Sequence, residues 1–164
     1  MSANKTLLKQ TLIYGIATVL PRVISFLLVG LHTDLMPKVA YGEITILLAY
    51  MIFFNVILSY GMETAFFRFY HKEENKNEVI STATVSIFWS TVLFLCITLL
   101  FQKTLAGLLN VDKEYVNYAI WILAFDALVI IPFSKLRAEQ KAIKYSVLKI
   151  SNVIINMLLN VFLL

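Results

Sequence analysis

An arginine in the middle of an apolar run is the most unusual feature of this 164-residue sequence. The run "TVLPRVISFLL" (residues 18–28) carries Pro21 and Arg22 side by side. A guanidinium at mid-membrane costs at least about 2.5–3.5 kcal/mol and usually faces a cavity or an acidic partner. Its paired N–H donors suit phosphate oxygens, and a proline tends to kink a helix. We predict that Arg22 lines a polar cavity beside a kink at Pro21; a packing ion pair is the alternative.

The polar residues around Arg22 are spaced so that they share one side of a helix. They are Thr11, Tyr14, Thr18, Arg22, Ser25 and His32, separated by three, four, four, three and seven positions. That spacing keeps the side chains on one face. A helix surrounded only by lipid has no reason to sort its polar residues. This face is therefore predicted to meet protein or water.

Four further residues could act in the same cavity. Asp126, in "ILAFDALVII", is the natural counterpart of Arg22, and an ion pair, a proton or sodium site, and a neutral carboxyl in the bundle remain open. Glu63 and Arg68 are five positions apart, so they do not face one another well on one helix. Asn55 lies two turns before Glu63. We expect Asn55, Glu63 and Arg68 in the cavity, although Arg68 also fits a simple interfacial cation.

The composition predicts the elements that must position these residues. The chain is 60% hydrophobic and 15% charged, whereas soluble domains carry about 25% charged residues. Five stretches have about the 20 apolar residues that a membrane helix needs. They are residues 11–31, 41–62, 79–101, 115–131 and 145–164, the fourth closed by Pro132. We predict an all-α bundle of membrane helices, and the apolar ending at Leu164 suggests the N-terminal part of a longer chain.

The distribution of lysine and arginine predicts the orientation. With five alternating helices, ten of these residues lie on one side and three on the other, while Arg22 is intramembrane. The positive-inside rule then places the N-terminus in the cytoplasm. The cations sit in short loops, so the net charge of +4 reflects topology rather than nucleic-acid binding. Residues 133–151 are predicted to form a basic, amphipathic elbow against anionic lipid head groups. The alternative is that its cations meet an anionic lipid-linked substrate.

Motifs for catalysis or metal binding are missing from the sequence. His32 and His71 fall at opposite interfaces, and Cys96 is the single cysteine, inside an apolar run. There is no glycine-rich phosphate loop and no nucleophile elbow. We expect neither an enzyme nor a cofactor or metal.

Three pieces of the sequence resemble a known family when they are taken in order. They are "LMPKVAYGEIT" at residues 35–45, "GMETAFFR" at residues 61–68, and "LRAEQKAIKYS" at residues 136–146. In this order and spacing the chain resembles the polysaccharide biosynthesis flippases, which include the O-antigen and lipopolysaccharide flippases. These belong to the multidrug/oligosaccharidyl-lipid/polysaccharide exporter superfamily. The resemblance covers the whole chain, which has about a third of a typical member's length.

This resemblance implies a function and a larger architecture. Members have 12 to 14 helices in two lobes around a central cavity and move undecaprenyl-pyrophosphate-linked glycans across the bacterial inner membrane by alternating access. It implies that cationic residues in the cavity bind the pyrophosphate. Arg22 is the first candidate for this role and Arg68 is the second. Two other functions stay open: a cation-coupled small-molecule exporter using Na⁺ or H⁺ at Asp126, and a non-transporting scaffold if the chain ends at Leu164. Membrane lipids are the other expected partners.

Overall fold

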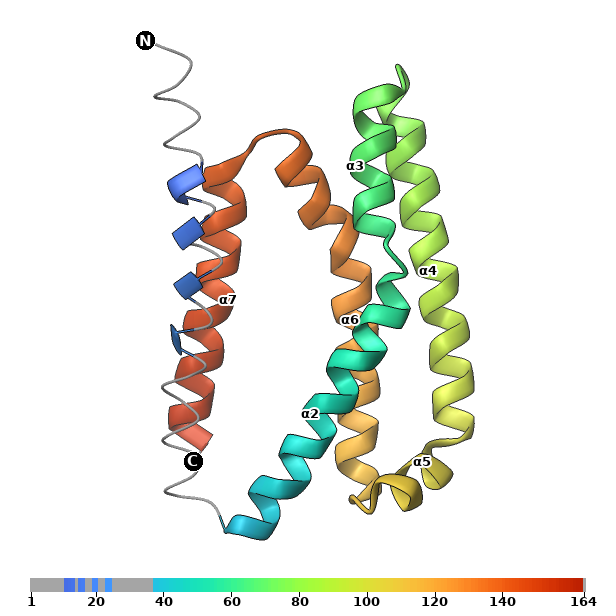
Figure 1. Ribbon diagram of the computed structural model, residues 1–164, viewed down its shortest axis with the longest axis vertical. Coiled ribbons are helices and arrows are strands. Elements are labelled where there is room, and N and C mark those ends of the chain that lie inside the picture. Colours follow the sequence, from blue (N-terminus) through green and yellow to red (C-terminus); the bar gives the residue numbers. More distant parts are fainter. Residues whose placement is uncertain (1–10, 14, 17–18, 21–22, 25–36, 164) are drawn as a thin grey trace. The chain divides into compact units, whose positions relative to one another are not determined.

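The computed structural model describes residues 11–13, 15–16, 19–20, 23–24 and 37–163 (Figure 1). The chain divides into two compact units. The central unit is Gly42–Ala138, and the terminal unit combines Met1–Tyr41 with Glu139–Leu164. Within the described residues every regular element is a helix, which confirms the all-α prediction. The elements are α2 (Lys38–Ser59), α3 (Met62–Lys72), α4 (Lys76–Leu100), α5 (Gln102–Leu109), α6 (Lys113–Ala138) and α7 (Ala142–Leu163).

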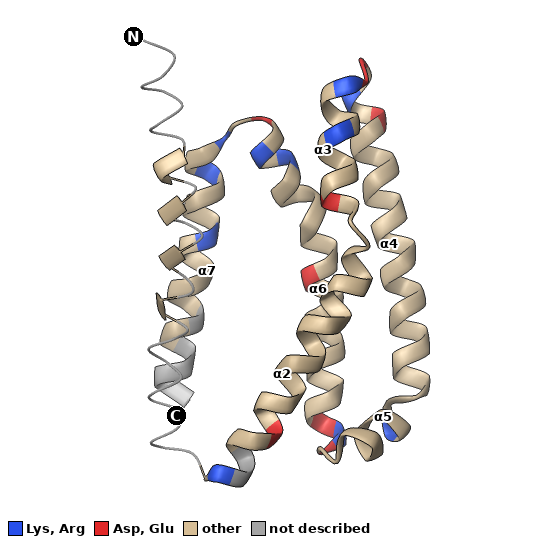
Figure 2. Ribbon diagram, viewed as in Figure 1, with Lys and Arg blue, Asp and Glu red and all other residues tan. Residues whose placement is uncertain are grey.

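Three stretches of the described chain are long and apolar enough to cross a membrane. They are Tyr41–Lys72, which includes most of α2 and all of α3, Lys76–Leu100 and Lys113–Ala138. Large apolar side chains on α2 point away from the rest of the protein, with Ile52, Phe53 and Val56 being 70%, 61% and 67% exposed. Lys, Arg, Asp and Glu gather mostly near helix ends (Figure 2). An apolar surface of this kind indicates a membrane protein.

The predicted helix at residues 41–62 is interrupted at Tyr60 and Gly61. Their φ angles are 32° and 71°, in the left-handed region. Glycine adopts this conformation freely, whereas an L side chain such as that of Tyr60 is strained there. The Tyr60 hydroxyl and Ser86 Oγ of α4 are 2.8 Å apart in a hydrogen bond that anchors the break. The chain resumes as α3, so Glu63 and Arg68 lie on a separate helix from Asn55.

Local capping sets the limits of α4 and α5. Asn75 caps α4, because its Oδ1 accepts the Glu78 backbone N–H at 3.3 Å and its Nδ2 donates to Glu78 Oε2 at 3.3 Å. The sequence reasoning had not assigned a helix to the residues of α5. That helix ends at Asn110, whose φ of 53° is a left-handed cap.

Helix α6 continues through Pro132 to Ala138, so the predicted end before Pro132 is wrong. A proline removes one backbone hydrogen bond. The turn that follows is nevertheless held in the bundle, because Ile131, Ser134 and Ala138 are buried. Packing can maintain a helix through a proline when its neighbours hold both sides.

The predicted elbow at residues 133–151 is divided between two helices. Its first part completes α6, a turn follows in which Gln140 has a φ of 56°, and its second part begins α7. An ion pair between Lys141 and Glu139 lies within this turn. The segment is therefore helical on both sides of a turn at residues 139–141, and its contact with lipid head groups stays a prediction.

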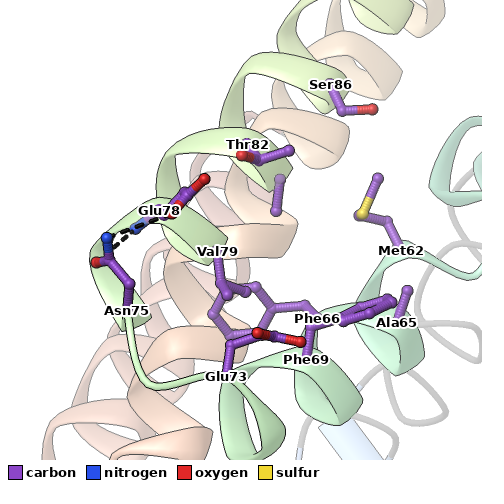
Figure 3. Close-up of a pocket in the computed structure, with 11 residues that line it drawn as sticks. Met62, Ala65, Phe66, Phe69, Glu73, Asn75, Glu78, Val79, Thr82 and Ser86 are labelled. Carbon is purple, nitrogen blue, oxygen red and sulfur yellow. Dashed lines mark hydrogen bonds between the residues drawn. The ribbon is translucent and has the colours of Figure 1, made fainter.

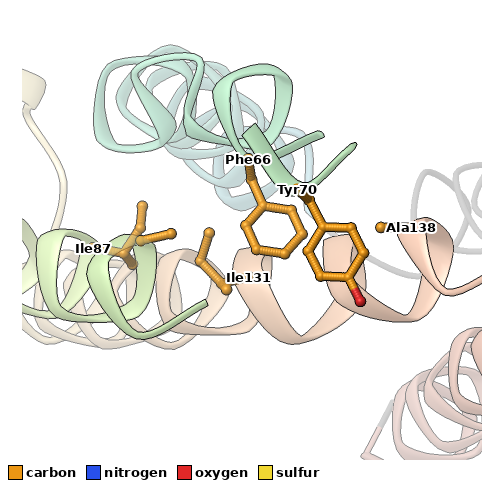
Figure 4. Packing of buried hydrophobic residues seen from close by; sticks show 6 residues of the cluster. Phe66, Tyr70, Ile87, Ile131 and Ala138 are labelled. Carbon is orange, nitrogen blue, oxygen red and sulfur yellow. The ribbon is translucent and has the colours of Figure 1, made fainter. Parts of the chain in front are cut away.

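The central unit is held together by α3, α4 and α6, each of which contacts the other two. One cluster joins all three and contains Phe66, Tyr70, Ala83, Ile87, Ile131 and Ala138. Figure 4 shows the Phe66 and Tyr70 rings extending from α3, and these rings stack with centroids 5.3 Å apart. A second cluster, around Ala106, Val116 and Ile120, joins α5 to α6. Small residues on α6, such as Ala124 and Ala127, allow the close helix approach that membrane bundles use.

The terminal unit contains α7 and the described turns among residues 11–24. The buried Ser146 hydroxyl of α7 donates to the Ile13 carbonyl oxygen at 3.4 Å. This bond connects the first helical segment with the last one inside the same unit.

Candidate functional site

The cavity prediction for the first helix falls outside the described residues. Pro21 and Arg22 belong to that part of the chain, as do Tyr14, Thr18, Ser25 and His32. Of the predicted polar face only Thr11 is described, and it is exposed. The candidate site is therefore built from the four other predicted residues, all of which belong to the central unit.

Glu63 forms an ion pair with Arg137, which connects the first turn of α3 to the last turn of α6. The Arg137 guanidinium also lies over the Phe67 ring, 5.1 Å from its centre. Both charged side chains are a little under half exposed. A guanidinium between a carboxylate and an aromatic face is held in orientation by both. This end of the unit therefore carries a fixed, accessible cation.

Asn55 and Arg68 are not joined to this ion pair. Asn55 is half-buried on α2, and Arg68 is exposed on α3. Among the described residues neither makes a hydrogen bond or an ion pair. The structure thus brings Glu63 together with Arg137 and leaves the other two predicted cavity residues apart.

Asp126 lies thirteen residues after the start of α6 and is exposed. The packed side of the helix at this level is formed by Leu123, Ala124 and Ala127, which are buried. Ile122 and Phe125, beside Asp126 on the outer side, are 49% and 61% exposed. A carboxyl group is thus presented at mid-helix by an otherwise apolar outer face.

Arg137 is the residue that sequence reasoning missed. The sequence predicts Arg137 as a cation of the basic elbow after the fourth helix, because that helix is expected to end before Pro132. Once α6 extends to Ala138, Arg137 falls on its last turn beside α3. The opposite charges of Glu63 and Arg137 were the available signal, although a single sequence does not show which helices are neighbours.

Comparisons with known proteins add no assignment: no family model, no curated protein and no solved structure matches the chain. Within the described residues, no group of three His, Cys, Asp or Glu side chains is placed to hold a metal ion.

Proposed function

We propose that the chain is part of a transporter that moves lipid-linked oligosaccharide across the bacterial inner membrane, with its N-terminus in the cytoplasm. The observation that carries the proposal is Asp126 on the outer face of α6 at mid-length. An ionisable group at this depth is costly in lipid and normally faces a protein-lined or water-filled space. The apolar spans and the resemblance to polysaccharide flippases support a transport pathway on that side.

The proposed substrate is the one that the resemblance implies, and its chemistry suits such a cavity. A lipid-linked glycan has an anionic pyrophosphate head on an apolar tail. A cavity open to one leaflet can hold the head while the tail stays in lipid. A mid-membrane guanidinium at Arg22 would bind the phosphate oxygens in pairs. Asp126 would then pair with that guanidinium or accept a proton as the cavity changes access.

Complementation of a strain lacking the gene tests this function. Arg22→Ala in the native gene product is expected to abolish export of the glycan, measured as polymer on the cell surface. Lys113→Ala, at the start of α6, is the matched control and should keep export. Full export by the Arg22 variant, with both proteins present in equal amounts in the membrane, would contradict the phosphate-binding cavity.

A cation-coupled exporter of small molecules is the second candidate, and the same Asp126 favours it. In that case Asp126→Asn would abolish transport driven by a Na⁺ or H⁺ gradient in proteoliposomes, while Arg22→Ala would leave it intact. A loss of transport in Arg22→Ala, with transport kept in Asp126→Asn, would support the flippase. Normal glycan export by both variants would leave the scaffold alternative.

A further inference from the structure

A groove of about 470 Å³ runs between α3 and α4 in the central unit. Figure 3 shows its lining. Met62, Phe66 and Phe69 of α3 form one apolar wall, and Val79 and Ala83 of α4 form part of the other. From Glu78 to Ser86 along α4 the groove extends for eight residues, or about 12 Å at the rise of a helix. Its volume is that of a small-molecule site.

One end of this groove is acidic. Glu73, Asn75 and Glu78 line it at the loop between the two helices. Among the described residues no lysine or arginine is paired with Glu73 or Glu78. The Glu78 carboxylate takes only the 3.3 Å hydrogen bond from Asn75. The groove therefore combines an apolar wall with two carboxylates that form no ion pair among the described residues.

We propose that this groove binds phosphatidylethanolamine, with the ammonium group at Glu73 and Glu78 and the apolar part of the lipid along Met62 and Phe69. The ligand must carry a cation and an apolar body, because the lining has this polarity. Lipid is the amphiphile that surrounds the ends of apolar spans. The proposal does not depend on transport.

The head-group chemistry favours the ethanolamine lipid over its relatives. A primary ammonium has three N–H donors for carboxylates, whereas the trimethylammonium of phosphatidylcholine has none. The net negative charge of phosphatidylglycerol is repelled by the two carboxylates. A metal ion would need more oxygen ligands than two carboxylates on an apolar wall.

Native mass spectrometry of the purified chain in detergent tests the proposal by titration with phosphatidylethanolamine, phosphatidylcholine and phosphatidylglycerol of identical tails. We expect phosphatidylethanolamine to bind most tightly. The double variant E73Q/E78Q should weaken its binding about tenfold or more, since two charged hydrogen bonds are lost. Glutamine can still accept at the helix cap, so the fold should stay intact. Far-UV circular dichroism checks this.

The control is E74Q, which changes a carboxylate of the same loop that does not line the groove. It should bind phosphatidylethanolamine like the unaltered chain. A second variant, Ala65→Trp, fills the groove and should also reduce binding while both carboxylates remain. Unchanged phosphatidylethanolamine affinity in E73Q/E78Q would overturn the proposal. Equal weakening by E74Q, or equal affinity for phosphatidylglycerol, would overturn it as well.

Discussion

The two ends of the central unit differ in what their helices enclose. At the α3 end, the cluster around Phe66 and Ile131 lies next to an acidic groove of about 470 Å³. At the α5 end, the cluster around Ile120 borders a cavity of only about 40 Å³ with a mostly apolar lining. Both ends are packed around buried apolar side chains, and the larger of these two spaces lies at the α3 end. The larger space is the one in which we propose that a lipid binds.

The largest test of this contrast is Phe66→Ala in the α3-end cluster. The Phe66 side chain is 1% exposed, and removing it leaves a cavity that costs about 3–5 kcal/mol of unfolding free energy. The measurement is denaturant unfolding in detergent micelles. The matched control is Phe69→Ala on the same helix. Phe69 is 46% exposed in the groove, and its truncation should cost far less. If the two variants lost equal unfolding free energy, Phe69 would be packed as tightly as Phe66, and the groove would not be open.

A single substitution type should act with opposite sign at the two ends. Gly61→Ala at the α3 end places a Cβ where φ is 71° and should destabilise the fold by about 1–2 kcal/mol. Gly107→Ala in α5 meets nothing within 4 Å, and alanine in a helix should stabilise by about 0.5–1 kcal/mol. Thermal unfolding of the two variants measures both effects. A stabilising Gly61→Ala would contradict the left-handed break between α2 and α3.

Two buried threonines of α4 should respond differently to loss of the hydroxyl. Thr91 Oγ1 is buried with no hydrogen-bond partner among the described residues. Thr98 Oγ1 donates to the Phe94 carbonyl at 2.7 Å. Thr91→Val should therefore stabilise the protein by about 1 kcal/mol, whereas Thr98→Val should be neutral or destabilising. Unfolding midpoints compare the two. An equal loss of stability would mean that the Thr91 hydroxyl has a partner in the folded chain.

The smallest effect concerns the ion pair between Glu63 and Arg137. A double-mutant cycle with Glu63→Gln and Arg137→Gln should give a coupling of about 0.2–1 kcal/mol, because both side chains are a little under half exposed. The cycle of Glu63→Gln with Arg68→Gln should give none. A coupling of several kcal/mol would show that lipid rather than water surrounds the pair, and that the α3 end is less accessible than its groove implies.

The sequence predicted the helical class well and the helix connections less well. Low charge and long apolar stretches indicated membrane helices. Helix α4 contains all but the last residue of the predicted stretch at residues 79–101, and α6 contains the whole stretch at residues 115–131. The break at Tyr60 was missed because the apolar pattern continues on both sides of it. Pro132 was taken as a helix end because local rules stop a helix there. The burial of Ile131 and Ser134, which holds α6 together, is a tertiary effect.

The site was harder to predict than the fold. The sequence predicts Glu63 as a cavity residue and Asp126 as an ion-pair or ion-coupling residue, and the structure places Glu63 in an ion pair and Asp126 on an outer face. Arg137 as the partner of Glu63 depends on which helices are neighbours. The groove depends on how far α3 and α4 diverge. The packing of helices that are distant in the sequence determines both features, and a single sequence does not give that packing.

The break at Tyr60 and Gly61 also bears on how the protein fits bilayers of different thickness. The 22 residues of α2 extend about 33 Å and match a hydrocarbon core of about 30 Å without help. The 25 and 26 residues of α4 and α6 extend about 37 and 39 Å, so these helices must tilt or project. If the helix were continuous from Tyr41 to Lys72, its α2 and α3 parts would have the same tilt in the membrane. The break separates the tilt of α2 from that of the α3–α4 hairpin, so hydrophobic mismatch is absorbed at two residues.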